Sequence, residues 1–261
     1  MTSDDITIHR GLTGVYFDRS ETTFIDGKEG VLEYRGYNIN ELAEHSTFEE
    51  TGYLLIHGKL PTQAELNEFD AELKAGRELP EQIFDVIELV KDSHPMDALR
   101  TAVSALAGFD PDRADNSAEA TIRKGNRLTS QVPAIVMAHH NIRQGKDPIK
   151  PSTTLNHAGN FLYMMDGNEP SSQAMNLMDK DFVLHADHGS NASAFTARVV
   201  AGTAADIHGA VTAGIAALSG PSHGGAAENV MQMAKEIGTA DRAADYVQNL
   251  LTNRERVMGF G

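Results

Sequence analysis

The spacing of apolar residues predicts a chain that is helical over most of its length. From residue 39 onward apolar positions recur every three or four residues, as Ile83, Ile87 and Val90 do. Glycine and proline separate successive stretches, and Thr62 followed by Glu65 has the spacing of a helix-capping box. The stretches follow one another without a repeat or an inter-domain linker. We therefore expect a mainly α-helical chain packed as one body.

Residues 12–36 show a different pattern. Short runs of β-branched and aromatic residues alternate with the turn sequences Asp26-Gly27 and Glu29-Gly30. This alternation is typical of short antiparallel strands joined by tight turns. We predict a small N-terminal sheet of two or three strands beside the helices.

Two polar, histidine-bearing turns bracket a stretch of small apolar residues between 185 and 230. The first turn carries His185, Asp187, His188 and Asn191, and the second is the run from Gly220 to Gly225. Ala and Gly dominate the residues between them, which suits helices whose backbones approach closely. We interpret the rest of the chain as the scaffold that holds these two turns.

His223 is the strongest single candidate for catalysis. Pro221 fixes the approach of the chain, Ser222 suits a helix N-cap, and His223 would then fall in the first helical turn. The positive end of a helix disfavours a charged imidazolium, so a neutral His223 could donate a hydrogen bond to a carbonyl that becomes an enolate. The run Ser-His-Gly-Gly can equally form a tight turn without any role in catalysis.

A metal site is an alternative use of the histidines. The chain has 11 His and no Cys. His185 and His188 lie three residues apart with Asp187 beside them, which could place ligands on one helix face. The spacing fixes no third ligand, and the HExxH pattern is absent. We place a metalloprotein last among the hypotheses and predict no bound metal.

The composition argues against several classes of protein. The 37 acidic and 22 basic residues give a formal net charge of −15, which argues against nonspecific binding to nucleic acid or to an anionic membrane. No apolar run approaches the ~20 residues that a membrane helix needs. The first residues lack the basic and apolar regions of a signal peptide. We expect a cytoplasmic protein.

Several motifs resemble the citrate synthase family, which includes the 2-methylcitrate synthases. They are LEYRGYNINELAEHSTFEETGYLLIHGKLP, HPMDALRTAVSAL, NFLYMMDG, HADHGSNASAFTARV, LSGPSHGGAAENVM and the final RVMGFG. They follow one another in the family's order over essentially the whole chain, which makes the resemblance specific. It implies a mostly helical homodimer, with residues 1–220 in a large domain and residues 221–261 beginning a smaller one. The small-residue helices between about 192 and 218 would pack across the dimer interface.

The resemblance also implies a reaction, the condensation of acetyl-CoA with oxaloacetate and water to citrate and coenzyme A through an enol(ate). His223 matches the family's histidine that hydrogen-bonds the thioester carbonyl. His188 matches its oxaloacetate-binding histidine, with Asn191 nearby as a further contact. The loop that contacts coenzyme A matches Val257, Met258, Gly259, Phe260 and Gly261. No metal or redox cofactor is implied, because the coenzyme A thioester is a co-substrate.

The resemblance does not cover a complete active site. In the family the Gly-Phe-Gly loop is followed by a second catalytic histidine, and the aspartate base and the arginines that bind substrate carboxylates lie further on. None of them has a counterpart among these 261 residues. Condensation needs a base for the acyl methyl group and an acid for the developing alkoxide. We therefore expect no synthase activity from these 261 residues alone.

Two alternatives remain open. Acetyl-CoA and propionyl-CoA differ by one methylene, worth only ~1–3 kcal/mol in an apolar pocket, so a 2-methylcitrate synthase is the nearest alternative to a citrate synthase. The missing side chains also allow a non-catalytic dimerisation or binding module, although the intact Gly-Pro-Ser-His-Gly-Gly turn favours the enzyme. Binding and reaction of an acyl-CoA with oxaloacetate would separate these hypotheses.

Overall fold

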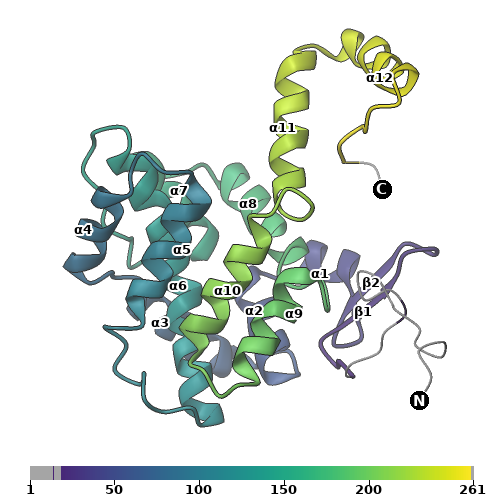
Figure 1. Ribbon diagram of the computed structural model, residues 1–261. Helices are drawn as coiled ribbons and strands as arrows, with labels where there is room; N and C mark the ends of the chain where they lie inside the picture. The colour runs from purple at the N-terminus through teal and green to yellow at the C-terminus, as the bar shows by residue number, and fades with distance from the viewer. Residues whose placement is uncertain (1–13, 15–18, 260–261) are drawn as a thin grey trace, which may run out of the picture.

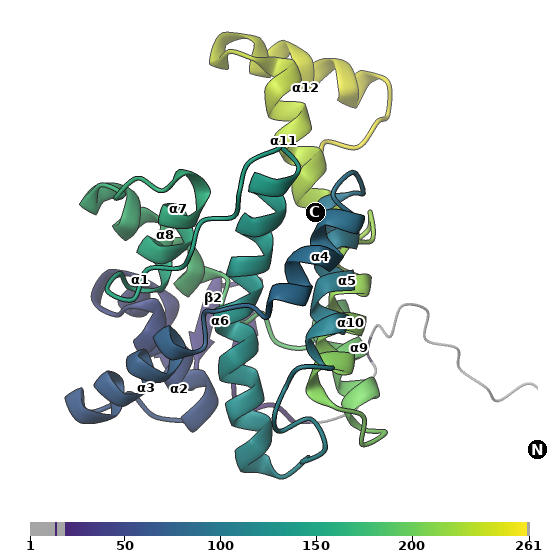
Figure 2. The same cartoon turned by 90° about the vertical axis from the view of Figure 1, so that its left-hand side faces the viewer.

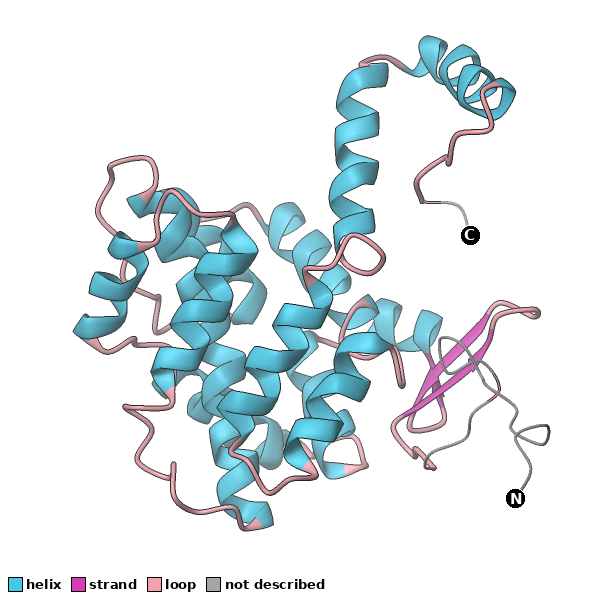
Figure 3. Cartoon of the chain, in the orientation of Figure 1, coloured by secondary structure: helices cyan, strands magenta, loops and turns pink. Residues whose placement is uncertain are grey.

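The computed structural model describes residue 14 and residues 19–259 of the 261-residue chain. It is mainly α-helical, as the sequence pattern predicts, with a small sheet at one side of the helical body (Figures 1 and 3). In chain order the helices are α1 (Ile39–His45), α2 (Phe48–His57), α3 (Gln63–Ala75), α4 (Glu81–Leu89), α5 (Pro95–Leu106), α6 (Ala118–Ile142), α7 (His157–Asp166), α8 (Ser172–Leu184), α9 (Ala192–Ala201), α10 (Ile207–Leu218), α11 (Gly225–Ile237) and α12 (Ala243–Thr252), with a short 3₁₀ helix, η3 (Ala240–Arg242), before the last.

Side-chain caps begin several of the helices. Thr47 and Glu50 form a capping box at the start of α2, and Thr62 and Glu65 form the predicted one at the start of α3. In each box the threonine oxygen accepts from the glutamate's backbone N–H, and the glutamate carboxylate accepts from the threonine's N–H. Gly58 ends α2 with a left-handed φ of 79°, a conformation that glycine adopts at little steric cost.

The N-terminal sheet is confirmed where the structure describes it. Its strands are β1 (Thr23–Asp26), β2 (Val31–Tyr34) and β3 (Tyr37–Asn38), paired antiparallel in the order β1-β2-β3. Thr23 lies directly opposite Tyr34 in the register. Residues 12, 13 and 15–18 of the predicted range lie outside the described residues.

The main hydrophobic core lies between α4, α5, α6 and α10. Ile83 and Ile87 of α4 and Ile135 of α6 are completely buried there. The regularly spaced apolar residues of the sequence therefore form the face of α4 that packs on its neighbours. Burying side chains of this size stabilises the fold by roughly 1.5–3 kcal/mol each. A second cluster, which includes Tyr34 and Val183, joins β2 to α2 and α8.

Helices α9 and α10 pack with their backbones close together. A Cβ atom on Gly214 of α10 would lie 3.4 Å from the Ser193 carbonyl oxygen and 3.6 Å from Ala197 Cβ of α9. A side chain larger than a methyl group at Gly214 would push the two helices apart. The small residues of this stretch therefore allow close packing within the chain, as predicted.

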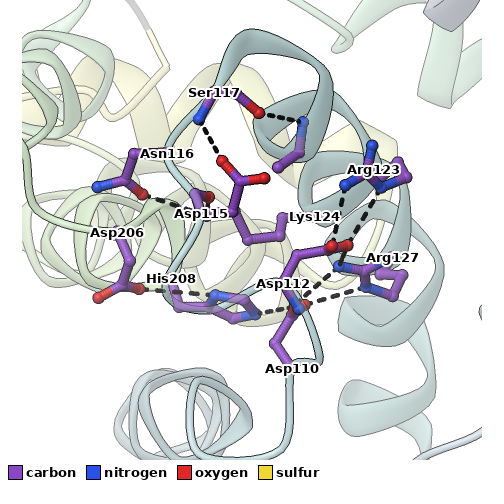
Figure 4. A network of polar contacts seen from close by, with 11 residues as sticks. Asp110, Asp112, Asp115, Asn116, Ser117, Arg123, Lys124, Arg127, Asp206 and His208 are labelled. Carbon is purple, nitrogen blue, oxygen red and sulfur yellow. Dashed lines mark hydrogen bonds and ion pairs between the residues drawn. The ribbon is translucent and has the colours of Figure 1, made fainter.

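A polar network fixes the start of α10 (Figure 4). Arg127 of α6 donates to the two carboxylate oxygens of Asp110 at 2.7 and 3.0 Å and to Asp112 at 2.7 Å. His208, in the first turn of α10, is almost fully buried between Asp110 and Asp206 at 3.5 and 3.6 Å. Burial lowers the pKa of His208 although the two carboxylates oppose the shift. The network ties the α5–α6 loop to the helix that leads into the second histidine turn.

Helices α11 and α12 extend from one end of the helical body (Figures 1 and 2). Neither helix contains a buried residue. His94, the N-cap of α5, lies 3.3 Å from Glu228 of α11 and so connects the body to this extension. The domain boundary near residue 221, which the resemblance implies, stays a prediction. No helix in the described part of the chain is long and apolar enough to span a lipid bilayer.

Candidate functional site

The two histidine-bearing turns lie at the same end of a helix pair. The first turn (residues 185–191) joins α8 to α9, and the second (residues 219–224) joins α10 to α11. Ser193 at the start of α9 lies beside Gly214 in the second half of α10. The close packing of α9 on α10 therefore brings the two turns together, although about 30 residues separate them in the sequence.

The second turn folds back tightly on the end of α10. The N–H groups of His223 and Gly225 both donate to the Gly220 carbonyl oxygen, at 2.9 and 3.2 Å. A Cβ on Gly224 would lie 2.5 Å from the Leu218 carbonyl oxygen. Only glycine allows the two backbone segments to approach this closely, so the turn itself requires a glycine at position 224.

His223 precedes α11 and is not part of it. The helix begins at Gly225 with Gly224 as its N-cap. The prediction that Ser222 caps the helix and places His223 in its first turn is therefore wrong. The turn's own carbonyls take the first N–H groups of the helix, because Ala226 N–H donates to His223 O at 3.0 Å. Backbone hydrogen bonds close the turn, so α11 begins without a side-chain cap.

Ser193 connects the two turns. Its Oγ lies 2.7 Å from Asn191 Oδ1 and 3.0 Å from His223 Nε2. Asn191 is the N-cap of α9, and its Oδ1 also accepts from Ala194 N–H at 2.9 Å. Asn191 and His223 were expected from the sequence and Ser193 was not. A serine near an asparagine N-cap is common at helix starts and gives no signal of a site.

The hydroxyl of Ser193 carries a single proton. If that proton goes to Asn191, Ser193 accepts a hydrogen bond from a protonated Nε2 of His223. If it goes to Nε2, the neutral imidazole carries its own proton on Nδ1. No group among the described residues hydrogen-bonds to Nδ1, and the His223 side chain is half-buried. In the second arrangement His223 can offer Nδ1–H to a ligand while Ser193 holds the opposite nitrogen.

The side chains of the first turn point to different partners. His188 is exposed and has no hydrogen bond to a described residue. His185 is exposed as well, and its Nδ1 lies 2.8 Å from the Asp181 carbonyl oxygen of α8 and 3.4 Å from the Asp181 carboxylate. Asp187 accepts a hydrogen bond from Thr23 of β1. The described part of the chain holds no cluster of three or more His, Asp or Glu side chains that could bind a metal ion.

The predicted coenzyme A segment lies against α11. A Cβ on Gly259, whose φ is 87°, would lie 3.0 Å from Val230 Cγ2 of that helix. Val257 and Met258, in the same segment, are half-buried. Phe260 and Gly261 lie outside the described residues. The segment thus approaches the helix that begins directly after His223.

Three further histidines are internal parts of the fold. His139 Nε2 lies 3.1 Å from the Lys91 carbonyl oxygen, and His208 belongs to the network at the start of α10. His157 stacks on Phe48 with ring centroids 4.5 Å apart. Burial, with a smaller contribution from Arg77, lowers the pKa of His157 to about 4.

A groove of about 660 Å³ lies away from these turns. It is bounded by α4, α6 and the loop of residues 145–151. None of the residues that line it belongs to either histidine turn. The candidate site therefore rests on the chemistry of the two joined turns and not on the position of this groove.

Known proteins match this chain over nearly its whole length. Residues 11–261 match the family model described as "Citrate synthase, C-terminal domain". The citrate synthase of Deinococcus radiodurans is 48% identical over 97% of this chain and 68% of its own length. The 2-methylcitrate synthase of Mycobacterium tuberculosis is 39% identical over 97% of this chain and 64% of its own length. The chain spans about two-thirds of the length of these relatives.

Solved structures show the same fold. The citrate synthase of Pyrobaculum aerophilum, 38% identical, superposes with a TM-score of 0.92 over 99% of this chain and 67% of that one. The citrate synthase of Thermoplasma acidophilum, 27% identical, superposes with a TM-score of 0.91 over 98% of this chain and 68% of that one. The latter was solved as a ternary complex with carboxymethyl coenzyme A and oxaloacetate.

Proposed function

Because this chain belongs to the citrate synthase family, we propose that it serves the condensation of acetyl-CoA with oxaloacetate and water to citrate and coenzyme A. The observation that carries the proposal is the 3.0 Å contact between Ser193 Oγ and His223 Nε2. This contact orients a half-buried imidazole and leaves Nδ1 for a ligand. When Ser193 donates to Nε2, the neutral ring carries Nδ1–H, and a hydrogen bond from Nδ1–H to the thioester oxygen becomes stronger as that oxygen gains negative charge.

The chemistry assigns His223 the role of enolate stabiliser. A base removes a methyl proton of the acyl group, and the resulting enolate carbon attacks the ketone carbon of oxaloacetate. An acid protonates the new alkoxide, and water then cleaves the thioester to release citrate and coenzyme A. His223 supplies one hydrogen bond and neither the base nor the acid. We therefore propose that a polypeptide of these 261 residues binds the substrates but produces no citrate by itself.

His188 and Asn191 are the proposed oxaloacetate contacts. The exposed His188 side chain is free to meet a carboxylate or the ketone oxygen. Asn191 Oδ1 already accepts a hydrogen bond from Ala194 N–H, which leaves its NH₂ group for an anionic ligand. The Ser193 bridge supports this assignment, because it links the oxaloacetate side of the site to the thioester side.

The proposed coenzyme A segment runs from Val257 to Gly261. Its described part lies beside Val230 of α11, near the helix start that follows His223. Backbone N–H groups of a glycine-containing loop can bind phosphate or carbonyl oxygens. This placement supports a coenzyme A thioester as co-substrate, without a resident metal or redox cofactor.

Acetyl-CoA is the proposed acyl donor, and propionyl-CoA is the competitor. The relatives include proteins named citrate synthase and 2-methylcitrate synthase, and the more similar of the two reported above is a citrate synthase. One methylene changes binding by only ~1–3 kcal/mol, so use of both donors is compatible with the family. Competition of the two thioesters for one preparation would measure the preference directly.

We also propose a homodimer through the helices between about 192 and 218. Helix α9 contains no buried residue, and Val199 of α9 and Leu218 of α10 are exposed apolar side chains. Contact with a second copy would remove such surface from water. Light scattering after size exclusion should give twice 28.2 kDa, and Val199→Glu should give a monomer. A wild-type mass of 28.2 kDa would refute the dimer.

Calorimetric titration of the 261-residue chain with oxaloacetate tests the binding site. Wild type should bind, and His188→Ala should weaken binding roughly tenfold or more, as expected for loss of a hydrogen bond to a charged ligand. His185→Ala is the matched control, because His185 is an exposed histidine of the same turn that pairs with Asp181. No binding by wild type would favour the non-catalytic module.

A second assay follows coenzyme A release, and turnover above background would contradict the proposed inactivity of the chain alone.

A further inference from the structure

The N-terminal sheet reaches across the chain to the turn that carries His188. Tyr34, the last residue of β2, is completely buried. Its hydroxyl donates toward the Asp187 carbonyl at 2.9 Å and the Leu184 carbonyl at 3.1 Å, and it accepts from Asp187 N–H at 3.2 Å. One side chain from residue 34 thus binds three backbone groups near residue 185.

One of these contacts pairs a carbonyl at the end of α8. Leu184 is the last residue of α8, so its carbonyl has no partner within the helix. The Tyr34 hydroxyl supplies that partner and at the same time fixes the first residues of the turn. Burial raises the pKa of Tyr34, so the hydroxyl keeps its proton as a donor at neutral pH.

The neighbouring strand holds the same turn through a side chain. Thr23 lies opposite Tyr34 in the β1–β2 register, and its Oγ1 donates to Asp187 Oδ2. Ile25 of the same strand approaches Gly189, where an added Cβ would lie 3.8 Å from Ile25 Cδ1. The sheet therefore contacts Asp187 and lies close to Gly189, the two residues that flank His188 in the sequence.

We propose that Thr23 and Tyr34 form a clamp that positions His188 for oxaloacetate before the ligand arrives. The inference rests on the proposed function, since it assigns a role toward the same ligand. A turn that is ordered in advance loses less conformational entropy when it binds. The clamp gives the small sheet a part in substrate binding, through positioning residues that do not touch the substrate.

Hydrogen–deuterium exchange tests the clamp in the 261-residue chain without requiring turnover. Tyr34→Phe keeps the buried ring and removes the hydroxyl. The peptide spanning residues 184–191 should then exchange about tenfold faster, because a buried hydrogen-bonding group is lost. Peptides from α6 should exchange at the wild-type rate. Tyr37→Phe is the matched control, since Tyr37 is an exposed tyrosine of β3. Unchanged exchange in Tyr34→Phe would overturn the clamp.

Oxaloacetate affinity tests whether the clamp acts through His188. Tyr34→Phe should weaken binding about fivefold to tenfold, and the same change in a His188→Ala background should add nothing. Thr23→Val should weaken binding, and Thr23→Ser, which keeps the hydroxyl, should restore it. Faster exchange with wild-type affinity would overturn the positioning role. Failure of the wild-type chain to bind oxaloacetate would overturn the proposed function instead.

Discussion

Ser193 Oγ lies 3.0 Å from His223 Nε2 and joins that histidine to Asn191, which caps α9. The contact links two turns that are distant in sequence, so that they form one candidate site. It also determines which imidazole nitrogen faces a ligand, because Nε2 is already occupied. The serine is therefore as informative about the site as the histidine it holds.

Removal of the Ser193 hydroxyl should release the His223 ring. In Ser193→Ala we expect the imidazole ¹⁵N chemical shifts to move toward those of an imidazole that exchanges freely between its two tautomers. Affinity for carboxymethyl coenzyme A should fall roughly fivefold, corresponding to one hydrogen bond of about 1 kcal/mol. Ser222→Ala is the control, because Ser222 is an exposed serine beside the same histidine. Identical ¹⁵N shifts in wild type and Ser193→Ala would refute the contact.

The second turn should not tolerate a side chain at Gly224. The Cβ of Gly224→Ala would meet the Leu218 carbonyl oxygen at 2.5 Å, so the backbone must move. We expect a loss of about 1–3 kcal/mol in the free energy of unfolding, typical of overpacking, measured by urea denaturation. Gly27→Ala provides the control, since its Cβ meets no atom within 4 Å, and it should change stability by less than ~0.5 kcal/mol. Equal stability of the two variants would contradict this description of the turn.

His157 should make stability depend on pH. Burial, with a smaller effect of Arg77, lowers its folded-state pKa from 6.5 to about 4. Between pH 6.5 and 4 the unfolded chain binds a proton at His157 that the folded chain does not bind. The free energy of unfolding therefore falls as the pH falls from 6.5 to 4. Below pH 4 His157 is protonated in both states and causes no further change. The loss amounts to about 3 kcal/mol.

The variant His157→Phe isolates that effect. Phenylalanine retains an aromatic ring against Phe48 and Phe182 and cannot titrate. The difference in unfolding free energy between wild type and His157→Phe should therefore change with pH over the same window. His45→Ala, at an exposed position of α1, is the control for removal of a surface histidine. A difference that stays constant from pH 7 to 4 would contradict the low pKa.

The contact between His94 and Glu228 should restrict the direction of α11. His94 Nδ1 accepts from Met96 N–H at 3.2 Å, so the proton of the neutral ring is on Nε2, which faces Glu228 at 3.3 to 3.4 Å. Glu228→Ala should broaden the distance distribution between spin labels placed by Asp92→Cys and Lys235→Cys. The chain has no native cysteine that would compete for the label.

Asn229→Ala, an exposed neighbour on α11, is the control for that measurement. Because both partners are exposed, the contact contributes little to global stability. We therefore expect the melting temperature to stay the same while the distribution broadens. An unchanged distribution in Glu228→Ala would show that other contacts hold α11.

The sequence predicts local structure well because local structure has local causes. The repeat of Ile83 and Ile87, the Thr62–Glu65 box and the glycine turns between β1 and β2 are all visible within a few residues. The start of α11 was misplaced because serine is a favoured N-cap. There, the hydrogen bonds to the Gly220 carbonyl determine the backbone instead.

The site itself was predicted only in part. His188, Asn191 and His223 were expected through the family resemblance, whereas the connection through Ser193 depends on how α9 packs on α10. The contact of Tyr34 with Asp187 spans 153 residues, and no spacing rule reaches that far. Tertiary packing creates both relationships, so local patterns in the sequence do not reveal them.

Calorimetric titration with carboxymethyl coenzyme A in the presence of saturating oxaloacetate tests the central claim most directly. The claim is that His223 donates a hydrogen bond to the thioester oxygen of an acyl-CoA, whose place a carboxylate oxygen takes in this ligand. The account predicts binding by wild type and by the control His45→Ala, and at least roughly tenfold weaker binding by His223→Ala, as for a hydrogen bond to a charged group. Equal affinity of wild type and His223→Ala would contradict it.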